Sequence, residues 1–332
     1  MENEYATSEL NFTYYLGAGA SAQALPTVLK LPESFRALAN EIRINDKIDS
    51  TYLDAKKFYA DRLEWLATNS EKYGTIDTFA KFLYLRNSTD FEHLKKTINF
   101  FFALRQGLDG YRDPRALIFL TTVMKIDQFF PPNINIISWN YDFQIELAAE
   151  EFRKESFATL RTGGFRHSPP VILYYPNVGA GTSREFQLIH LNGIAGLFRD
   201  EVTNVRKSHL HNTPFKDIND FFEKTEARAQ HSRVLSFAFE AEEAEQRLTY
   251  AKQLVQNTDI LVVIGYSFPY FNRDIDKAIF EMLKENKRLK IIYFQNPILD
   301  GQFLYNQFGI NKNEVDIRHD KSDGNYFIPF EL

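Results

Sequence analysis

Residues 259–267 contain the strongest indication of the fold class: Asp-Ile-Leu-Val-Val-Ile-Gly-Tyr-Ser. The five residues from Ile260 to Ile264 are all apolar, without the alternation of a half-exposed strand. Such an uninterrupted run is typical of a strand that is buried on both faces of a parallel sheet. It ends at Gly265, where the chain can turn sharply. The sequence therefore predicts a central strand of a parallel sheet at this position.

Other short apolar runs predict further strands at residues 11–16, 134–139, 171–175, 186–191 and 290–294. Segments with helical character separate several of them, at residues 142–153, 214–257 and 274–286. Strands that alternate with helices indicate an α/β protein. We therefore expect a Rossmann-like, mostly parallel sheet that is flanked by helices.

A helical insertion is predicted after the first strand. Apolar residues recur there at positions i, i+3, i+4 and i+7, for example at Phe35, Leu38, Ala39 and Ile42. The pattern ends at Pro131-Pro132, because adjacent prolines cannot continue a helix. We expect a single domain over residues 1–332, within which residues 32–130 form the insertion.

Composition excludes several classes of function. The 332 residues carry a net charge of −5, so the basic excess of most nucleic-acid-binding proteins is missing and no direct nucleic-acid contact is expected. The absence of cysteine excludes disulfides, a cysteine nucleophile and cysteine-rich zinc sites, and no other metal motif occurs. No apolar run approaches the length of a membrane span or signal peptide. We therefore expect a cytoplasmic protein without a metal or a membrane contact.

Small and polar residues follow four of the predicted strands, and they mark the candidate site because ligands of parallel sheets bind outside the carboxyl ends of the strands. These residues are Gly17, Ala18, Gly19 and Ser21, then Asn140 and Asp142, then Gly265 and Ser267, and finally Asn296. Each group also has an ordinary structural explanation. Glycines permit turns, Asp142 can cap the following helix, and Asn296-Pro297 can form a turn.

A further candidate is the segment Leu188-Ile189-His190-Leu191-Asn192-Gly193. His190 and Asn192 lie two residues apart, so they share one face of a strand. A single strand histidine is more often a hydrogen-bonded core residue than a catalyst.

The order of these motifs resembles the sirtuin-like NAD-binding domain. The sequence has Gly-Ala-Gly-x-Ser followed by Leu25-Pro26, then Asn-Tyr-Asp, His-Leu-Asn-Gly, Ile-Gly-Tyr-Ser and Asn-Pro. The resemblance spans residues 14–297 and is greater to the stand-alone bacterial sirtuin-like proteins of anti-phage defence systems than to the protein deacetylases.

The resemblance implies a role for each motif. The glycine loop with Gly17, Ala18, Gly19 and Ser21 would hold the NAD pyrophosphate, and Pro26 is counted with these cofactor-binding residues. Asn140 and Asp142 match the nicotinamide and ribose pocket. Gly265 and Ser267 match the second nucleotide loop, and Asn296 matches the residue near the adenine ribose.

Two positions depart from the family pattern. The deacetylases carry a four-cysteine zinc module, so a chain without cysteine is expected to hold no zinc, and a deacylase is less favoured. In the family, the catalytic histidine directly precedes a glycine. In this chain Asn192 precedes the glycine, and the histidine lies two residues earlier, at His190. The sequence leaves open whether His190, Asn192 or another histidine such as His167 fills that role.

The expected function is that of an NAD+ hydrolase that releases nicotinamide and ADP-ribose through an oxocarbenium-like state. Asn140 would orient the ribose or water, Asp142 would stabilise the loop or the cation, and His190 would be the base. The resemblance implies a toxic effector of anti-phage defence, gated by oligomerisation or by a partner such as a hexameric ATPase of the DNA-translocase type. The alternative is a module that binds NAD or ADP-ribose as a signal. A deacylase or a nuclease subunit is less favoured.

Overall fold

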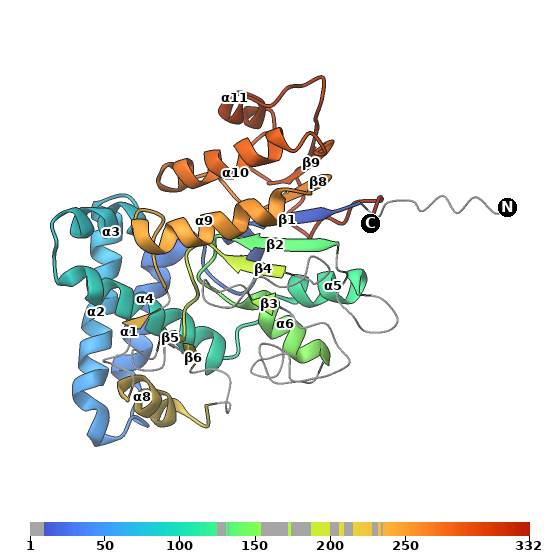
Figure 1. Ribbon diagram of the computed structural model, residues 1–332. Helices are drawn as coiled ribbons and strands as arrows, with labels where there is room; N and C mark the ends of the chain where they lie inside the picture. The colour runs from blue at the N-terminus through green and yellow to red at the C-terminus, as the bar shows by residue number, and fades with distance from the viewer. Residues whose placement is uncertain are drawn as a thin grey trace.

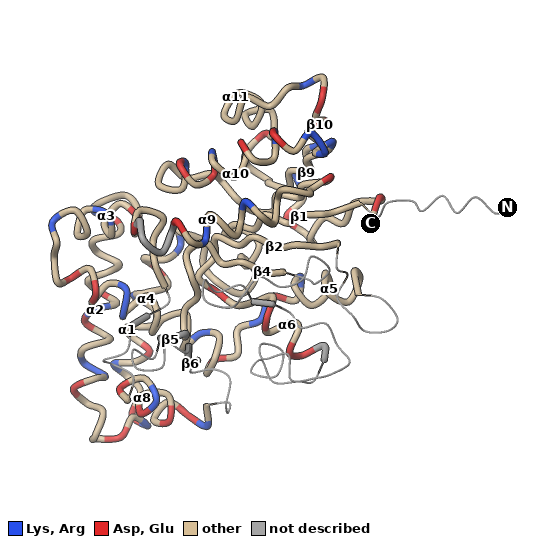
Figure 2. Tube along the Cα trace, in the orientation of Figure 1, with Lys and Arg blue, Asp and Glu red and all other residues tan. Residues whose placement is uncertain are grey.

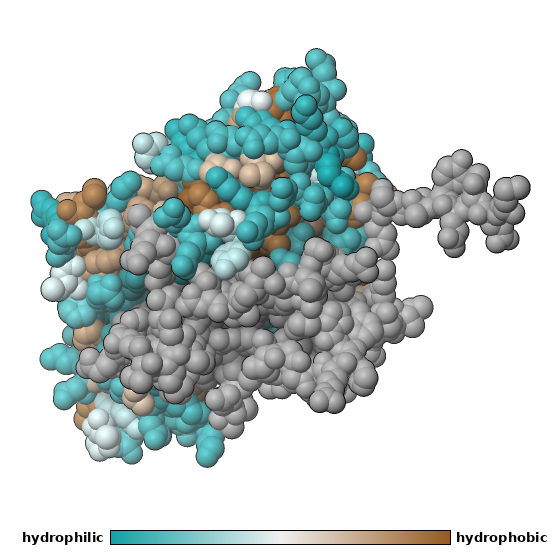
Figure 3. Space-filling model, viewed as in Figure 1, coloured by the Kyte–Doolittle hydropathy of each residue, from teal (hydrophilic) through white to brown (hydrophobic). Residues whose placement is uncertain are grey.

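The computed structural model describes residues 10–124, 131, 133–153, 172–173, 187–199, 206–208, 215–227, 232–233 and 235–332. Within them, helices pack on both faces of a central sheet, and a separate group of helices lies beyond one end of the strands (Figure 1). Figure 3 shows hydrophobic residues scattered among hydrophilic ones on the face in view.

The central sheet has seven strands in the order β10-β9-β8-β1-β2-β4-β3, and all neighbouring pairs are parallel. The predicted Rossmann-like parallel sheet is therefore confirmed. Its strands are β1 (Phe12–Leu16), β2 (Ile134–Ser138), β3 (Ile172–Leu173), β4 (Gln187–His190), β8 (Ile260–Ile264), β9 (Ile291–Gln295) and β10 (Asp316–Asp320).

Burial on both faces explains the apolar run from which the fold class was predicted. Ile260, Val262 and Ile264 of β8 belong to the core on one face of the sheet. Leu261 and Val263 belong to the core on the other face. Successive side chains of a strand point to opposite faces, so a strand covered on both sides must be apolar throughout.

Helices cover the two faces of the sheet. Residues of α5 (Pro114–Val123) and α6 (Gln144–Arg153) share the core of one face. Residues of α9 (Ala241–Val255), α10 (Arg273–Glu285) and α11 (Phe303–Phe308) share the core of the other. α5, in the connection from β1 to β2, and α10, in the connection from β8 to β9, thus lie on opposite faces, which opens a crevice between the carboxyl ends of the neighbouring strands β1 and β8.

The helices between β1 and β2 divide into two groups. Four of them, α1 (Leu31–Ile44), α2 (Leu53–Lys72), α3 (Ile76–Leu85) and α4 (Asp90–Gly107), share a hydrophobic core of their own. We call these four helices the helical block. The fifth, α5, lies within the predicted insertion at residues 32–130 but packs on the sheet. The single-domain assignment with that insertion stays a prediction.

The predicted helical segment at residues 214–257 was wrong as one unit. Its described residues form α8 (Ile218–Glu226) and α9, with the short strand β7 (Ser232–Arg233) between them. β7 pairs with β5 (Leu197–Arg199), which also pairs with β6 (Arg206–Ser208) in a small antiparallel sheet. Phe237 is buried in the core of the helical block, so tertiary packing overrides the local helical pattern there.

Two further properties concern the length of the described helices and the distribution of charged residues. Among the described residues, no helix combines the length and the apolar character that a membrane crossing requires. Basic and acidic residues are interspersed along α2 (Figure 2).

Candidate functional site

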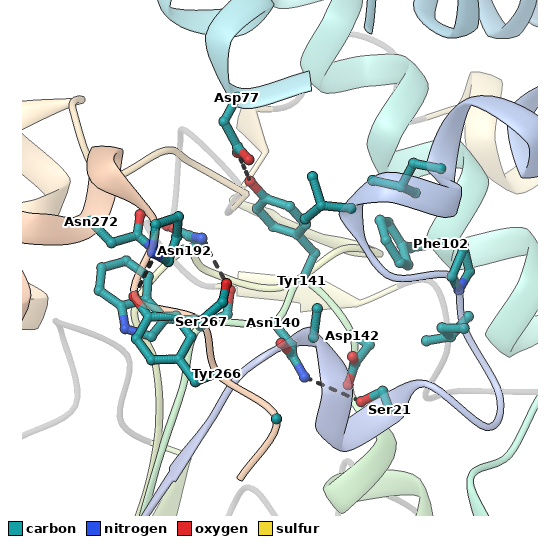
Figure 4. A pocket seen from close by; sticks show the side chains of 18 of the residues that line it. Ser21, Asp77, Phe102, Asn140, Tyr141, Asp142, Asn192, Tyr266, Ser267 and Asn272 are labelled. Carbon is teal, nitrogen blue, oxygen red and sulfur yellow. Dashed lines mark hydrogen bonds between the residues drawn. The ribbon is translucent and has the colours of Figure 1, made fainter. Parts of the chain in front are cut away.

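A cavity lies at the carboxyl ends of β1, β2 and β8, beside the crevice between β1 and β8 (Figure 4). Many of the residues predicted from sequence line it: Ala18, Ser21, Pro26, Asn140, Asp142, Asn192, Gly265 and Ser267. The helical block closes it from another side through Leu31, Asp77 and Phe102. Gly17, Gly19, His190 and Asn296 are not among the residues that line it.

Gly17 and Gly19 join the loop after β1 to the loop after β8. The amide of Gly17 donates to the carbonyl of Ile264 at 3.0 Å, and that of Gly19 donates to the carbonyl of Gly265 at 2.9 Å. A Cβ atom on Gly19 would lie 2.6 Å from the Cα atom of Gly265. The two glycines therefore permit loop packing, and their amides are engaged by the carbonyls of Ile264 and Gly265 rather than open to a phosphate.

A buried ion pair supports the first loop from behind. Arg115, in the first turn of α5, donates to the carbonyls of Gly19 and Ala20 at 3.1 and 3.0 Å. Its guanidinium also pairs with the carboxylate of Asp113 at 2.6 Å. Tyr326, near the chain end, donates to the same Ala20 carbonyl at 2.8 Å. Sequence analysis missed these residues because nothing local marks a helix-start arginine as a loop support.

Asn140 connects the end of β2 to the loop after β1. Its Nδ2 donates to the carbonyl of Gly17 at 3.0 Å and to Oγ of Ser21 at 3.2 Å. Among the described residues, none donates a hydrogen bond to its Oδ1. The carboxamide is thus held by its nitrogen, and its oxygen remains able to accept a hydrogen bond from a ligand (Figure 4).

Asp142 is both a cavity residue and a helix start. Its Oδ1 accepts a hydrogen bond from the amide of Gln144, the first residue of α6, at 3.2 Å. Burial raises its pKa to about 6, although hydrogen bonds from the Ser21 hydroxyl and the Gln144 amide act in the opposite direction. The capping role and the cavity role therefore coexist in one side chain.

Asp77 is a cavity residue that sequence analysis missed. It lies in the first turn of α3, where an acidic residue is common for reasons of helix stability alone. The hydroxyl of Tyr141 donates to its Oδ1 at 3.5 Å (Figure 4). Burial raises the pKa of Asp77 to about 6, against the hydrogen bonds from Tyr141 and from its own backbone.

His190 lies at the end of β4 in a buried ion pair. Its Nε2 contacts Oε1 of Glu146 at 2.7 Å, and its Nδ1 contacts the carbonyl of Asn140 at 3.2 Å. Burial lowers the pKa of His190, but the charge of Glu146 and the two hydrogen bonds outweigh it, so the pKa lies above 6.5. Both ring nitrogens are occupied, and His190 fits the core-histidine interpretation.

We expect this ion pair to make stability depend on pH. Because the pKa of His190 is raised on folding, its contribution is complete below about pH 6.5 and is lost as the pH rises through the folded-state pKa. The single substitution His190→Gln leaves Glu146 buried alone and should cost about 3–5 kcal/mol in the free energy of unfolding.

Urea denaturation between pH 6 and pH 9 measures this dependence. The control is the double variant His190→Gln/Glu146→Gln, in which neither member of the pair titrates. The wild-type protein should lose stability relative to the double variant as the pH rises. Parallel stability curves for the two proteins would contradict the prediction.

Asn192, two residues after His190, does line the cavity. Its Nδ2 donates to the carbonyl of Trp139 at 3.0 Å. Its Oδ1 is buried and has no hydrogen-bond partner among the described residues. An unpaired buried oxygen is costly, so this position favours a group that donates a hydrogen bond.

A buried carboxylate organises the aromatic wall of the cavity. Asp276 of α10 accepts hydrogen bonds from Tyr15, Trp139 and Tyr266 at 2.6, 3.1 and 2.9 Å. The rings of Trp139 and Tyr266 are stacked 6.0 Å apart and line the cavity. Burial raises the pKa of Asp276 to about 7, against these three hydrogen bonds.

The side chain of Asn296 holds the loop after β9 by hydrogen bonds. Its Oδ1 accepts hydrogen bonds from the amides of Ile298 and Leu299, both at 2.9 Å. Its Nδ2 donates to the carbonyl of Tyr266 at 3.2 Å. These contacts match the turn interpretation of Asn296-Pro297. His167, the other histidine considered from sequence, lies outside the described residues.

The cavity is acidic. Asp77 and Asp142 line it, and its described lining includes no lysine, arginine or histidine. No group of metal-binding side chains is found within the described part of the chain either. The site therefore suits a ligand whose buried portion is positively charged or becomes so during reaction.

The chain is similar in its overall course to solved sirtuin structures. One is Sir2Tm bound to a propionylated peptide, with a TM-score of 0.39 and 11% identity over 94% of this chain and 88% of that chain. Another concerns the structural basis of sirtuin substrate affinity, with a TM-score of 0.40 and 12% identity over 94% of this chain and 89% of that chain. No family model and no curated protein matches the chain.

Proposed function

We propose that this protein binds NAD+ with its nicotinamide ribose in the cavity and hydrolyses the bond between nicotinamide and ribose. The observation that carries the proposal is the group formed by Ser21, Asn140 and Asp142, which brings together two motifs far apart in sequence. The group lies beside the crevice between β1 and β8, where doubly wound sheets bind nucleotides. It also matches the residues that the sequence resemblance assigns to nicotinamide and ribose.

The charge of the cavity suits this reaction. Cleavage passes through an oxocarbenium-like state, and nicotinamide leaves as a neutral molecule that needs no proton. Carboxylates near the ribose stabilise the developing positive charge, more strongly in a buried site than in water. Asp142 would supply that charge, and the free Oδ1 of Asn140 would accept a hydrogen bond from a ribose hydroxyl or the attacking water.

The test is the release of nicotinamide and ADP-ribose from NAD+ by the purified full chain. Chromatography separates the two products from NAD+, and calorimetry on the same sample measures binding. The assay is run with the protein alone and with lysate from phage-infected cells, because the family resemblance implies a trigger. Release in either arm supports hydrolysis, whereas no binding and no release in both arms would contradict the proposal.

A second candidate is a module that binds NAD or ADP-ribose as a signal without cleaving it. A specific observation favours it: Asn192 stands where the family has its histidine, and His190 is held by Glu146 outside the cavity. Binding of NAD+ by calorimetry without nicotinamide release, in both arms of the assay, would select this candidate over the hydrolase.

The biological setting is proposed from the sequence resemblance alone. We propose a toxic effector of anti-phage defence in the cytoplasm, restrained until an oligomer or a partner such as a hexameric ATPase forms. Light scattering of the purified chain and a pull-down from infected cells test this. A monomer that hydrolyses NAD+ at full rate without a trigger would contradict it.

A further inference from the structure

The proposed hydrolysis needs a group that accepts a proton from water, and no described histidine lies in the cavity. His93 contacts Arg62 and Asp90 on the helical block. His190 is paired with Glu146, and His319 contacts the carbonyl of Asn296. Within the described cavity lining, the titratable groups that can accept a proton at neutral pH are the carboxylates of Asp77 and Asp142.

The two carboxylates differ in how fully their oxygens are engaged. Asp142 is 7% exposed, its Oδ1 accepts a hydrogen bond from the Gln144 amide at 3.2 Å, and the Ser21 hydroxyl lies near enough to lower its pKa. Asp77 is partly exposed, and beside the hydrogen bond from its own backbone its side-chain partner among the described residues is Tyr141, at the long distance of 3.5 Å. A base must have a free oxygen that a water molecule can reach. Asp77 meets that condition better than Asp142.

The position of Asp77 also suits a base. It enters the cavity from the helical block, whereas Asn140 and Asp142 enter from the end of β2. In Figure 4 its carboxylate meets the hydroxyl of Tyr141, and Asn140 and Asp142 lie toward the opposite side of the Tyr141 ring. A ribose held at Asn140 would therefore have a carboxylate on a second side of the cavity.

Building on the proposed hydrolysis, we propose that Asp77 is its general base, with Tyr141 as a positioning residue. The oxygen of a water molecule bonds to C1′ of the nicotinamide ribose. The bond from C1′ to the ring nitrogen breaks, and its electron pair remains on nicotinamide, which becomes neutral. One proton of the water passes to the Asp77 carboxylate and then to solvent. NAD+ and water thus yield nicotinamide, ADP-ribose and a proton.

Burial sets the direction of the pH dependence of Asp77, and few charged groups act on it. Tyr141 contacts it directly, and Glu240 acts on Tyr141 while pairing with Lys95 of α4 at 2.8 Å. Lys81, one turn further along α3, lies over the rings of Phe239 and Phe271. The pKa of Asp77 is raised to about 6, so a base at this position loses activity as the pH falls below about 6.

The experiment compares nicotinamide release by the full chain and by Asp77→Asn between pH 5 and pH 9. We expect kcat to fall about 100-fold or more, with the affinity for NAD+ by calorimetry within about threefold of the wild type. The acidic limb of the pH profile should weaken, leaving only the part that Asp142 contributes through its own pKa of about 6. The matched control is Asp54→Asn, an exposed aspartate in the first turn of α2, which should leave kcat unchanged.

Two further variants separate a catalytic role from a structural one. Tyr141→Phe removes a hydrogen bond that lowers the pKa of Asp77, so the acidic limb should move to higher pH while turnover persists. In Asp142→Asn the limb should remain although the rate falls, because Asp77 still titrates. These shifts would not follow from a loss of folding.

The outcomes distinguish this inference from the proposed function. An active wild type whose Asp77→Asn variant keeps both its kcat and its acidic limb would overturn Asp77 as the base and leave hydrolysis standing. A limb that disappears in Asp142→Asn but not in Asp77→Asn would assign the base to Asp142 instead. A wild type that binds NAD+ but releases no nicotinamide in either arm of the assay would overturn hydrolysis and this inference together.

Discussion

Replacement of Asn140 by alanine is expected to reduce nicotinamide release by about 100-fold or more, the cost usual for losing one well-placed polar group at a reacting centre. Both the nitrogen and the oxygen of the Asn140 carboxamide have a role. Its Nδ2 joins the carbonyl of Gly17 and the hydroxyl of Ser21, and its Oδ1 is open to a ligand. The variant therefore loses a contact to the ribose or water and the link between β2 and the loop after β1.

Chromatographic measurement of the nicotinamide released by the Asn140→Ala protein checks this expectation. The control is a variant in which an asparagine outside the site is changed to alanine. Asn313→Ala alters an exposed asparagine before β10 and should keep full activity. Thermal melting of both variants shows whether the fold is retained, since the carbonyl of Gly17 loses a buried partner in Asn140→Ala. Turnover by a folded Asn140→Ala protein at the wild-type rate would remove Asn140 from the site. If the wild type only binds NAD+, the same variant should lose affinity instead.

Replacement of Gly265 by alanine is expected to lower the free energy of unfolding by about 3–5 kcal/mol. Gly265 has a φ of +59°, and a Cβ atom there would lie 2.5 Å from the amide nitrogen of Ala20 and from Gly19. Both contacts are with backbone, so no side chain can move aside. The variant combines a left-handed conformation with the forced separation of the loops after β1 and β8.

Two matched glycine variants separate these contributions. Gly110 has a φ of +71°, and a Cβ atom added there would meet no other atom within 4 Å, so Gly110→Ala measures the cost of the conformation alone. Gly324 has open space and no positive φ, so Gly324→Ala should be nearly neutral. In urea denaturation, the free energy of unfolding of Gly265→Ala should be well below that of Gly110→Ala. Equal losses for those two variants would show that the contact between the loops is not required.

The order of strands and helices follows from local patterns. The apolar run in β8 can be recognised without the structure because burial on both faces excludes polar residues from every position. The ends of β2 and β9 are predicted within one residue for the same reason. The strand order was not predictable, because pairing depends on contacts between segments far apart in the chain. The small sheet of β5, β6 and β7 was missed for that reason as well.

Part of the candidate site could also be predicted from the sequence. Ser21, Asn140 and Asp142 each follow a strand that ends at the same edge of a parallel sheet, so their proximity follows from the fold class. The surroundings of His190, in contrast, do not follow from the fold class. Whether a strand histidine faces a cavity or a buried carboxylate depends on Glu146, which comes from α6 and meets it only in the folded protein.

The sequence of this protein is sufficient to predict a parallel α/β sheet and the edge at which its polar loops gather, because strand burial and strand-end residues are local properties. Only the tertiary structure brings Asp77 from the helical block to that edge and places Asp276 behind its aromatic wall. In sequence, Asp77 is an acidic residue at a helix start, with an ordinary structural explanation. Its place in the cavity is decided by packing between elements, which no local pattern records.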